Sequence, residues 1–404
     1  MTIQTRMLGV AALALMASTS APVLAQDQTV TMIQCGDALA DGYDGFIKTW
    51  EEKNPGFKVE VEVVGWAQCQ DKITTLAAAG TPVGLAYVGS RTLKQFADND
   101  LIVPIPMTDE EKASYYPNIV STVTIDDTQW GVPVAFSTKA LFWNKGLFEQ
   151  AGLDPEKAPA TWQELYDTAK AVTDKTDAAG FGLVAKTMDN TMHQFLHWVY
   201  TNDGKVIDGD EIVLDSPQNL EALEWVKKMV EVSEEGPTAY EQNELIALFN
   251  DQKIAMIEQG PWMRNRINEG IEWGVAPLPL GPQAKGPGTL LITDSLAVFK
   301  GTGYEDKAID LAKWLTNPEN QFYYEKTQGL TPLRPVPEVE SLVAEDPTWK
   351  PFLDGISNGG PEPLFLDYKG FENVAIEMIQ SVVTGQAEPA EALKAADEAA
   401  EEFK

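Results

Sequence analysis

Histidine and cysteine are nearly absent from this chain of 404 residues. It has only His193 and His197, and only Cys35 and Cys69. Neither cysteine has a histidine near it in sequence, so a Cys-His catalytic pair is not indicated. The sequence contains no G-x-S-x-G elbow and no phosphate-binding glycine loop. A Ser-His-Asp triad would have to use one of the two histidines. The i, i+4 spacing of the histidines suits a shared metal ion, but no glutamate lies between them as in H-E-x-x-H. We therefore interpret one histidine as packed under Trp198 and the other as facing a cleft, and we expect no metal and no cofactor.

Positive charge is also scarce. The chain has 30 lysines and arginines against 61 acidic residues, which gives a formal net charge of -31. Nucleic acids and anionic membrane surfaces attract basic proteins, so both are poor partners for this chain. Acidity of this size favours solubility.

A long apolar stretch occurs only in the first 25 residues. LGVAALALMA follows Arg6, and a tail of small residues ends at Ala25. This pattern is typical of a secretory signal peptide, here cleaved before Gln26. The alternative is an N-terminal membrane anchor, but the apolar core is shorter than the roughly 20 residues of a spanning helix. The sequence therefore predicts that residues 1–25 are a signal peptide.

Strand and helix patterns alternate after this leader. Val30–Cys35 is a buried-strand run, residues 42–53 have the pattern of a helix, and residues 58–64 alternate valine with glutamate as a half-exposed strand does. Repeated strand–helix–strand order predicts an α/β fold with parallel, doubly wound sheets. Because one hydrophobic core stops growing at about 250–300 residues, we expect two domains.

The two cysteines fall at corresponding strand ends. Cys35 ends the first predicted strand and Cys69 lies just past the second. If those strands are parallel neighbours, both thiols lie at the same edge of the sheet, and an oxidising compartment allows them to bridge. We predict a Cys35–Cys69 disulfide, with two separately buried thiols as the alternative.

Residues 129–165 form the most distinctive segment, QWGVPVAFSTKALFWNKGLFEQAGLDPEKAPATWQEL. An extended apolar run contains Pro133 and is followed by the hydroxyls of Ser137 and Thr138. An aromatic run then leads to Asn144, and a new helix begins after Thr161, with a glutamate at capping-box spacing. The pattern indicates a strand that crosses into a new structural unit and carries polar groups at the crossing.

This segment resembles the extracellular solute-binding proteins of ABC importers, specifically the family 1, maltose-type carbohydrate binders. The shared elements are Gly-Val-Pro, small polar residues, aromatic-aromatic-Asn-Lys, Gly-Leu-Asp and Thr-Trp-x-Glu. GLAYVGSRTLKQFADNDLIVPI and LFNDQKIAMIEQGPWM extend the resemblance, which spans most of residues 28–400. It implies a two-lobed periplasmic-binding-protein fold, in which each lobe is a doubly wound sheet flanked by helices and the chain crosses between lobes two or three times. The implied N-terminal lobe is 26–135 plus 286–332, and the C-terminal lobe is 136–285 plus 333–404.

Tryptophans beside glycine, proline or polar residues are the best candidates for contacting a sugar. Most of the eleven tryptophans must be core, but Trp66 and Trp262 occupy predicted loops. A flat indole suits the C–H face of a pyranose, and the ring hydroxyls then need charged or amide partners. The residues and the resemblance together give these candidate ligand contacts: Gln34, Asp37, Trp66, Gln68, Ser90, Ser137, Asn190, His193, Trp262, Asp294, Arg334 and Asp367. Arg334 has an open alternative, which is pairing with a surface glutamate rather than holding an anionic or polyhydroxyl group.

The resemblance implies a monomeric periplasmic subunit that captures a carbohydrate, plain or anionic-substituted, and delivers it to an ABC permease without altering it. No cysteine stands at the cleavage site, which favours a free protein over the family's lipid-anchored form. Two alternatives stay open. One is a secreted polysaccharide-active enzyme, which would need two carboxylates flanking its substrate, and the other is a ligand-loaded sensor for chemotaxis or signalling. The sequence leaves the choice among mono- and disaccharides, sugar alcohols and phosphorylated or sulfonated sugars open.

Overall fold

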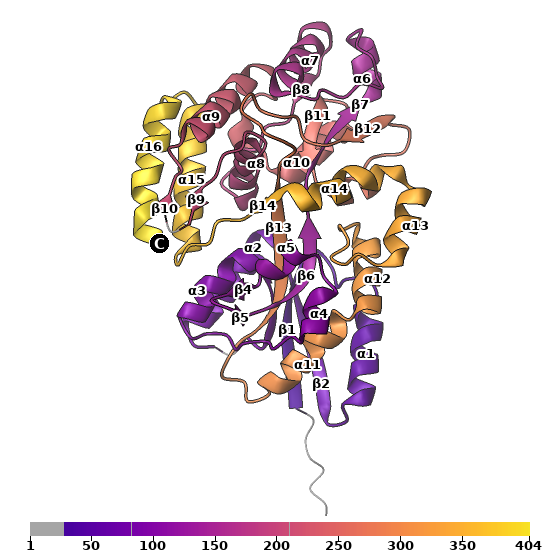
Figure 1. Cartoon of the computed structure of the whole chain (residues 1–404). Coiled ribbons are helices and arrows are strands. Elements are labelled where there is room, and N and C mark those ends of the chain that lie inside the picture. The colour runs from indigo at the N-terminus through magenta and orange to yellow at the C-terminus, as the bar shows by residue number, and fades with distance from the viewer. Residues whose placement is uncertain (1–27, 82, 210) are drawn as a thin grey trace, which may run out of the picture.

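The chain folds into two α/β lobes joined by several crossing segments (Figure 1). The structure is a computed structural model that describes residues 28–81, 83–209 and 211–404. The predicted signal peptide and its cleavage site lie outside these residues. Each lobe has a large hydrophobic cluster of its own, one around Val30, Leu85 and Val298 and the other around Trp162 and Phe181. Separate cores agree with the size argument for two domains.

The N-terminal lobe is built on a sheet of order β14-β13-β3-β1-β2, with β6 also paired to β13. Its strands are β1 (Gln28–Cys35), β2 (Phe57–Val64), β3 (Leu85–Gly89), β6 (Val132–Ser137), β13 (Thr289–Val298) and β14 (Gly359–Pro361). Helices α1 (Tyr43–Lys53), α2 (Trp66–Ala78), α3 (Leu93–Asp98), α11 (Glu305–Leu315) and α12 (Pro318–Gln328) belong to the same lobe. β1, β2 and β3 are parallel, as predicted, but β13 is antiparallel to β3 and β6. The sheet is mixed because β13 returns from the other lobe in the opposite direction.

The C-terminal lobe has a smaller sheet of order β12-β7-β11-β8. Its strands are β7 (Ala140–Asn144), β8 (Ala179–Phe181), β11 (Ile254–Gln259) and β12 (Trp273–Ala276). Its helices are α6 (Lys145–Gln150), α7 (Trp162–Lys175), α8 (Asp189–Tyr200), α9 (Pro217–Met229), α10 (Gln242–Asn250), α15 (Tyr368–Val383) and α16 (Pro389–Ala400). Local signals set the helix starts: Thr161 caps α7, and Ser216 caps α9 with Pro217 at its first position.

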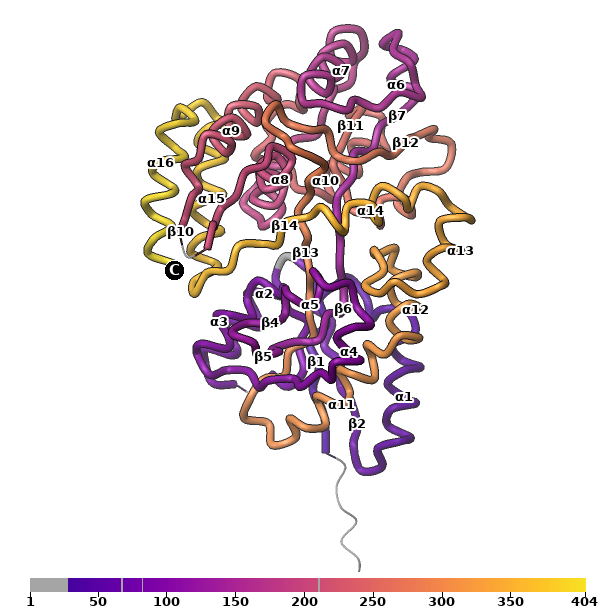
Figure 2. Tube along the Cα trace, in the orientation of Figure 1, coloured from indigo at the N-terminus to yellow at the C-terminus, as the bar shows by residue number. Residues whose placement is uncertain are grey.

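Several segments pass between the lobes, and their paths can be followed in Figure 2. Only Thr138 and Lys139 separate β6 from β7, residues 277–288 join β12 to β13, and residues 329–336 join α12 to α13 (Pro337–Glu345). The remaining elements are α4 (Asp109–Ala113), α5 (Pro117–Ser121), α14 (Lys350–Gly355) and the strand pairs β4 (Thr124–Ile125) with β5 (Thr128–Gln129) and β9 (Ile207–Asp208) with β10 (Glu211–Ile212). The lobe boundaries stated above stay a prediction.

The first strand and the second helix are tied by a disulfide. Cys35 at the end of β1 is bonded to Cys69 in α2, which confirms the predicted pairing. Helix α2 begins at Trp66, which the sequence pattern places in a loop. Trp66 is therefore the first residue of a helix and not a loop residue, because Gly65 already takes the N-cap position. In the part of the chain that the structure covers, no helix has the length and apolarity to cross a membrane.

Candidate ligand site between the lobes

A cavity of about 420 Å³ opens between the two lobes. Trp66 and Asp71 of α2 and Arg91 line it from the N-terminal lobe, and Asp189 of α8 and Tyr368 of α15 line it from the other. The beginnings of α8 and α15 therefore face the ends of the N-terminal strands. A cavity of this volume lies in the usual range of small-molecule sites.

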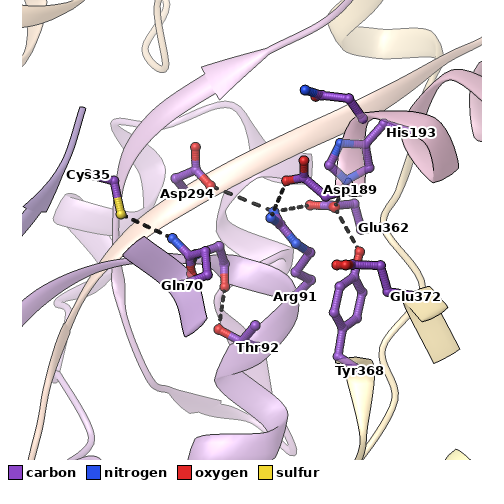
Figure 3. Close-up of polar contacts among 12 residues, drawn as sticks. Cys35, Gln70, Arg91, Thr92, Asp189, His193, Asp294, Glu362, Tyr368 and Glu372 are labelled. Atoms are coloured by element: carbon purple, nitrogen blue, oxygen red, sulfur yellow. Dashed lines mark hydrogen bonds and ion pairs between the residues drawn. The ribbon is translucent and has the colours of Figure 1, made fainter. Parts of the chain in front are cut away.

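A buried arginine at the cavity wall collects carboxylates from both lobes (Figure 3). Arg91 lies in η1 (Ser90–Thr92), directly after β3. Its guanidinium nitrogens are 3.3 Å from Asp189 Oδ2, 3.3 Å from Glu362 Oε2 and 3.8 Å from Asp294 Oδ1. The ring of Tyr368 lies 5.5 Å from the guanidinium carbon. One buried cation is therefore shared by three acidic groups.

Which carboxylates of this cluster are ionised depends on how close each one lies to a cation. Burial alone would raise the pKa of Glu362, but Arg91 and His193, whose Nε2 is 2.7 Å from Glu362 Oε1, lower it below its ordinary value. Burial raises the pKa of Asp294 to about 7, and Arg91 offsets this only in part. Near neutral pH, Glu362 is ionised, while Asp294 is partly protonated and accepts a hydrogen bond from the Tyr87 hydroxyl.

A second group surrounds the first crossing segment. Lys139, between β6 and β7, is 3% exposed; its Nζ lies 4.2 Å from the centroid of the Trp262 ring and 3.3 Å from Gln242 Oε1. Trp262 is half-buried in η4 (Pro261–Asn265), directly after β11. Its indole lies against Gly260, where an added Cβ would come within 2.4 Å of the ring. Glycine at this position thus allows the indole to fold back onto the chain.

Several buried polar atoms near these groups have no hydrogen-bond partner among the described residues. They include Asp189 Oδ1, Asp294 Oδ1 and His197 Nε2. The other ring nitrogen of His197 is 3.2 Å from Glu258 Oε2, and burial raises the pKa of Glu258 to about 8. Because a buried polar group without a partner costs roughly 1–3 kcal/mol, such atoms mark positions where ligand hydroxyls gain the most.

Residues 36–322 match the family model of the bacterial extracellular solute-binding proteins. The chain belongs to this family. A putative binding protein of Brucella abortus (strain 2308) is 28% identical over 356 residues, covering 86% of each chain. The galactooligosaccharide-binding protein of Bacillus subtilis (strain 168) is 25% identical over 374 residues, covering 86% of this chain and 83% of the relative. The crystal structure of an ABC transporter solute-binding protein of Thermotoga lettingae, bound with alpha-D-tagatose, superposes with a TM-score of 0.82 at 27% identity and covers 93% of this chain and 99% of that one. The resemblance and the two-lobed fold stated from sequence are therefore confirmed.

Of the candidate residues of this solute-binding protein, one lines the cavity and three lie in the Arg91 and Lys139 groups. Trp66 lines the cavity and packs edge-on against Tyr87, with ring centroids 5.8 Å apart. His193 and Asp294 belong to the Arg91 cluster, and Trp262 lies beside Lys139.

Three other candidates lie near the crossings or near α8. The Ser90 hydroxyl is 2.6 Å from that of Ser295 on β13, so it ties β3 to the crossing strand. Ser137 is buried at the end of β6, opposite Ile292 in the register with β13. Asn190 in α8 donates to Glu241 Oε2 at 3.3 Å.

The structure gives three further candidates local structural contacts. Gln34 Nε2 donates a hydrogen bond to Ala38 O, and Gln34 Oε1 accepts one from the backbone N–H of Ala40, so the amide is bonded within its own loop. The Arg334 guanidinium donates to Ser114 Oγ and Thr316 O and covers a tyrosine ring. Asp367 caps α15 by accepting from the backbone N–H of Gly370. The surface glutamate considered for Arg334 is therefore not its partner, since its hydrogen bonds go to a hydroxyl and a carbonyl.

Asp37 and Gln68 are exposed and do not line the cavity between the lobes. Lys139 and Glu362, in contrast, were not among the candidates. Lys139 directly follows the Ser137-Thr138 pair, and that position was the one available signal. The sequence around Glu362 carries no signal of a charged cluster, because its partners Arg91 and His193 are 271 and 169 residues away.

Proposed function

We propose that this solute-binding protein captures a sugar or sugar derivative between its lobes in the periplasm and delivers it to the permease of an ABC importer. The observation that carries the proposal is a cavity lined by both lobes, in which the half-buried indole of Trp66 lies together with Asp189, whose buried Oδ1 has no hydrogen-bond partner among the described residues. An aromatic face with hydroxyl partners around it is the combination that a pyranose requires. The tagatose-bound structure and the galactooligosaccharide-binding relative support the same ligand class.

Capture would be coupled to a hinge motion, because the cavity is lined by both lobes. A ligand shifts the population toward the closed form only by the extra free energy that it gains from contacts present in that form. Residues such as Trp66 in one lobe and Asp189 in the other supply those contacts. The closed shape is then the form that a permease would recognise, and the binding protein itself would act as a monomer without chemical turnover.

The charges around the cavity favour an uncharged ligand over an anionic one. Arg91 is already paired with three carboxylates, and Lys369 at the edge is paired with Glu372 at 2.6 Å and Asp71 at 3.9 Å. A phosphate or sulfonate placed in the cavity would meet acidic groups whose cations are taken. We therefore place uncharged saccharides and sugar alcohols ahead of the anionic-substituted sugars.

A binding panel tests the proposal. We would titrate the purified protein with D-tagatose, maltose, galactobiose, mannitol and sn-glycerol 3-phosphate, and analyse each compound after incubation. We expect one-to-one binding of at least one uncharged compound, recovered intact, by a protein that elutes as a monomer. Absence of binding across the uncharged set would contradict the proposal, and a cleaved product would favour the polysaccharide-active enzyme. A deletion strain that still takes up the bound sugar but no longer responds to it would favour the sensor.

A further inference from the structure

Lys139 is a buried lysine without an acidic partner. Its ammonium forms no ion pair among the described residues, although the chain carries 61 acidic residues. The polar contacts of Nζ are Gln242 Oε1 at 3.3 Å and the face of Trp262 at 4.2 Å. A protonated amine has three N–H donors, so at least one of them has no oxygen acceptor. Burying a charged group in this way is costly unless a further partner is present.

The position of Lys139 makes a ligand the natural further partner. It stands at the two-residue crossing between β6 and β7, where the two lobes meet. A sugar that contacts the Trp262 indole comes within reach of an ammonium held 4.2 Å from the ring centroid. The two cations that line the cavity, Arg91 and Lys369, are already paired with carboxylates, whereas Lys139 lies beside Trp262 without such a partner among the described residues. Lys139 is thus the cation best placed to donate to a bound molecule.

We propose that Lys139 is a specificity-determining residue whose ammonium donates a hydrogen bond to an oxygen atom of a saccharide lying against Trp262. This inference rests on the proposed function and deepens it, because it names the protein group that donates a hydrogen bond to an acceptor oxygen of the ligand. Asp189 and Asp294 offer oxygen atoms to ligand hydroxyl donors, whereas Lys139 offers N–H to a ligand acceptor. The pair of requirements selects a polyhydroxylated molecule and rejects a deoxy analogue that lacks the oxygen next to Trp262.

The pH dependence of ligand affinity distinguishes hydrogen bonding by the Lys139 ammonium from a purely structural role of Lys139. Burial lowers the pKa of Lys139 to about 7, against the opposing effect of Asp189, Glu258 and Asp294. The other titratable groups that interact with it are Arg266 and His197, and burial lowers the pKa of His197 well below its ordinary value. Since the charged ammonium is the stronger donor, affinity should be highest below pH 7 and should fall as the amine loses its proton.

Titration calorimetry between pH 6 and pH 8.5, with D-tagatose, maltose and galactobiose as probes, tests the inference. For a probe that binds the wild type, we expect affinity to fall several-fold across this range. K139M should bind at least tenfold more weakly at pH 6, equivalent to about 1.4 kcal/mol, and should show a flatter pH profile. K139Q keeps an N–H donor without the charge, so it should bind with intermediate affinity and the same flat profile. Glu258, Asp294 and His197 are present in every variant, so the difference between profiles reports on Lys139.

Lys175→Met is the control, because this exposed lysine donates to Ala151 O on the far side of the C-terminal lobe and should bind like the wild type. Thermal unfolding of each variant checks that it is folded, and removal of a buried charge is not expected to prevent folding. Wild-type affinity that is unchanged from pH 6 to pH 8.5, or equal affinity of K139M and wild type, would overturn the inference and leave the proposed function standing. Failure of the wild type to bind any of these three probes or mannitol would contradict both.

Discussion

Arg91 Nη2 lies 3.3 Å from Asp189 Oδ2, and the two residues belong to different lobes. The guanidinium follows β3 in the N-terminal lobe, whereas Asp189 is the first residue of α8 in the C-terminal lobe. Burial alone would raise the pKa of Asp189, but His193 and Arg91 lower it below its ordinary value, so this carboxylate is ionised at neutral pH. The proposed hinge motion would break this contact as the lobes separate. The contact would then contribute to the free energy difference between the open and closed forms, in addition to any ligand.

Arg91→Met should open the protein in the absence of ligand. The substitution leaves Asp189, Glu362 and Asp294 without their shared cation, and removing one partner of a buried pair costs about 3–5 kcal/mol. Separation of the lobes returns these carboxylates to water, so we expect a larger radius of gyration in small-angle scattering than for the wild type. Lys170→Met, which breaks only an exposed pair with Asp174, is the control. An unchanged radius for the arginine variant would show that the cluster does not hold the lobes together.

Trp262→Ala should weaken sugar binding by at least tenfold, about 1.4 kcal/mol, with little loss of stability. The indole is half-buried beside Lys139, so its removal takes away a ligand surface more than core packing. Calorimetry with a sugar identified in the panel measures this. Trp225→Ala is a matched control, since Trp225 is also half-buried and has a lysine ammonium 4.1 Å from its ring centroid, but it lies on α9, away from the cavity. If the Trp262 variant keeps its affinity, Trp262 is not part of the site.

Removal of the Cys35–Cys69 disulfide should lower the free energy of unfolding. The bond joins residues 34 positions apart, and loop-closure entropy predicts a loss of about 3–4 kcal/mol when a loop of that length is released in the unfolded chain. Urea unfolding of the Cys35→Ser, Cys69→Ser double variant against the wild type measures the difference. Wild type with added reductant should move toward the double variant, whereas reductant should leave the variant unaffected. Equal midpoints for all samples would mean that the bond contributes little.

Glu325→Gln should stabilise the protein more at pH 8 than at pH 5. Glu325 is buried in α12 and accepts hydrogen bonds from Leu333 N at 3.0 Å and from Gln321 Nε2 at 2.9 Å, while Gln321 also donates to Val134 O on β6. Burial raises the pKa of Glu325 to about 8. A raised folded-state pKa means that the folded chain binds the proton more tightly than the unfolded chain. The stability it provides is complete below about pH 4 and is lost as the pH rises toward 8.

Glutamine copies the protonated, neutral form of Glu325 and cannot ionise. The stability difference between variant and wild type should therefore grow between pH 5 and pH 8 by at least ~1.4 kcal/mol, the equivalent of one pKa unit. Denaturant unfolding at both pH values measures it, with the exposed Glu319→Gln on the same helix as a control that should show no such growth. If the stability difference between variant and wild type is the same at both pH values, ionisation of Glu325 does not destabilise the folded protein.

The sequence by itself determined the features that depend on neighbours within one or two turns or strands. Ser216 and Pro217 start a helix because a hydroxyl and a fixed backbone angle suit those positions wherever the helix packs. The Cys35–Cys69 pairing could be predicted because two parallel strands bring their ends to one edge of a sheet. The same local reasoning placed the first crossing at the end of β6.

Only the tertiary structure decided which polar residues meet between the lobes. Arg91 and Asp189 are 98 residues apart, and no local pattern in either segment specifies the other. Arg334 was a candidate because of its position in a crossing, yet its guanidinium is held by Ser114 and Thr316. The physical reason is that burial, desolvation and charge pairing depend on distances in space between distant segments. Those distances are fixed only when both lobes have packed and the crossings have set one against the other.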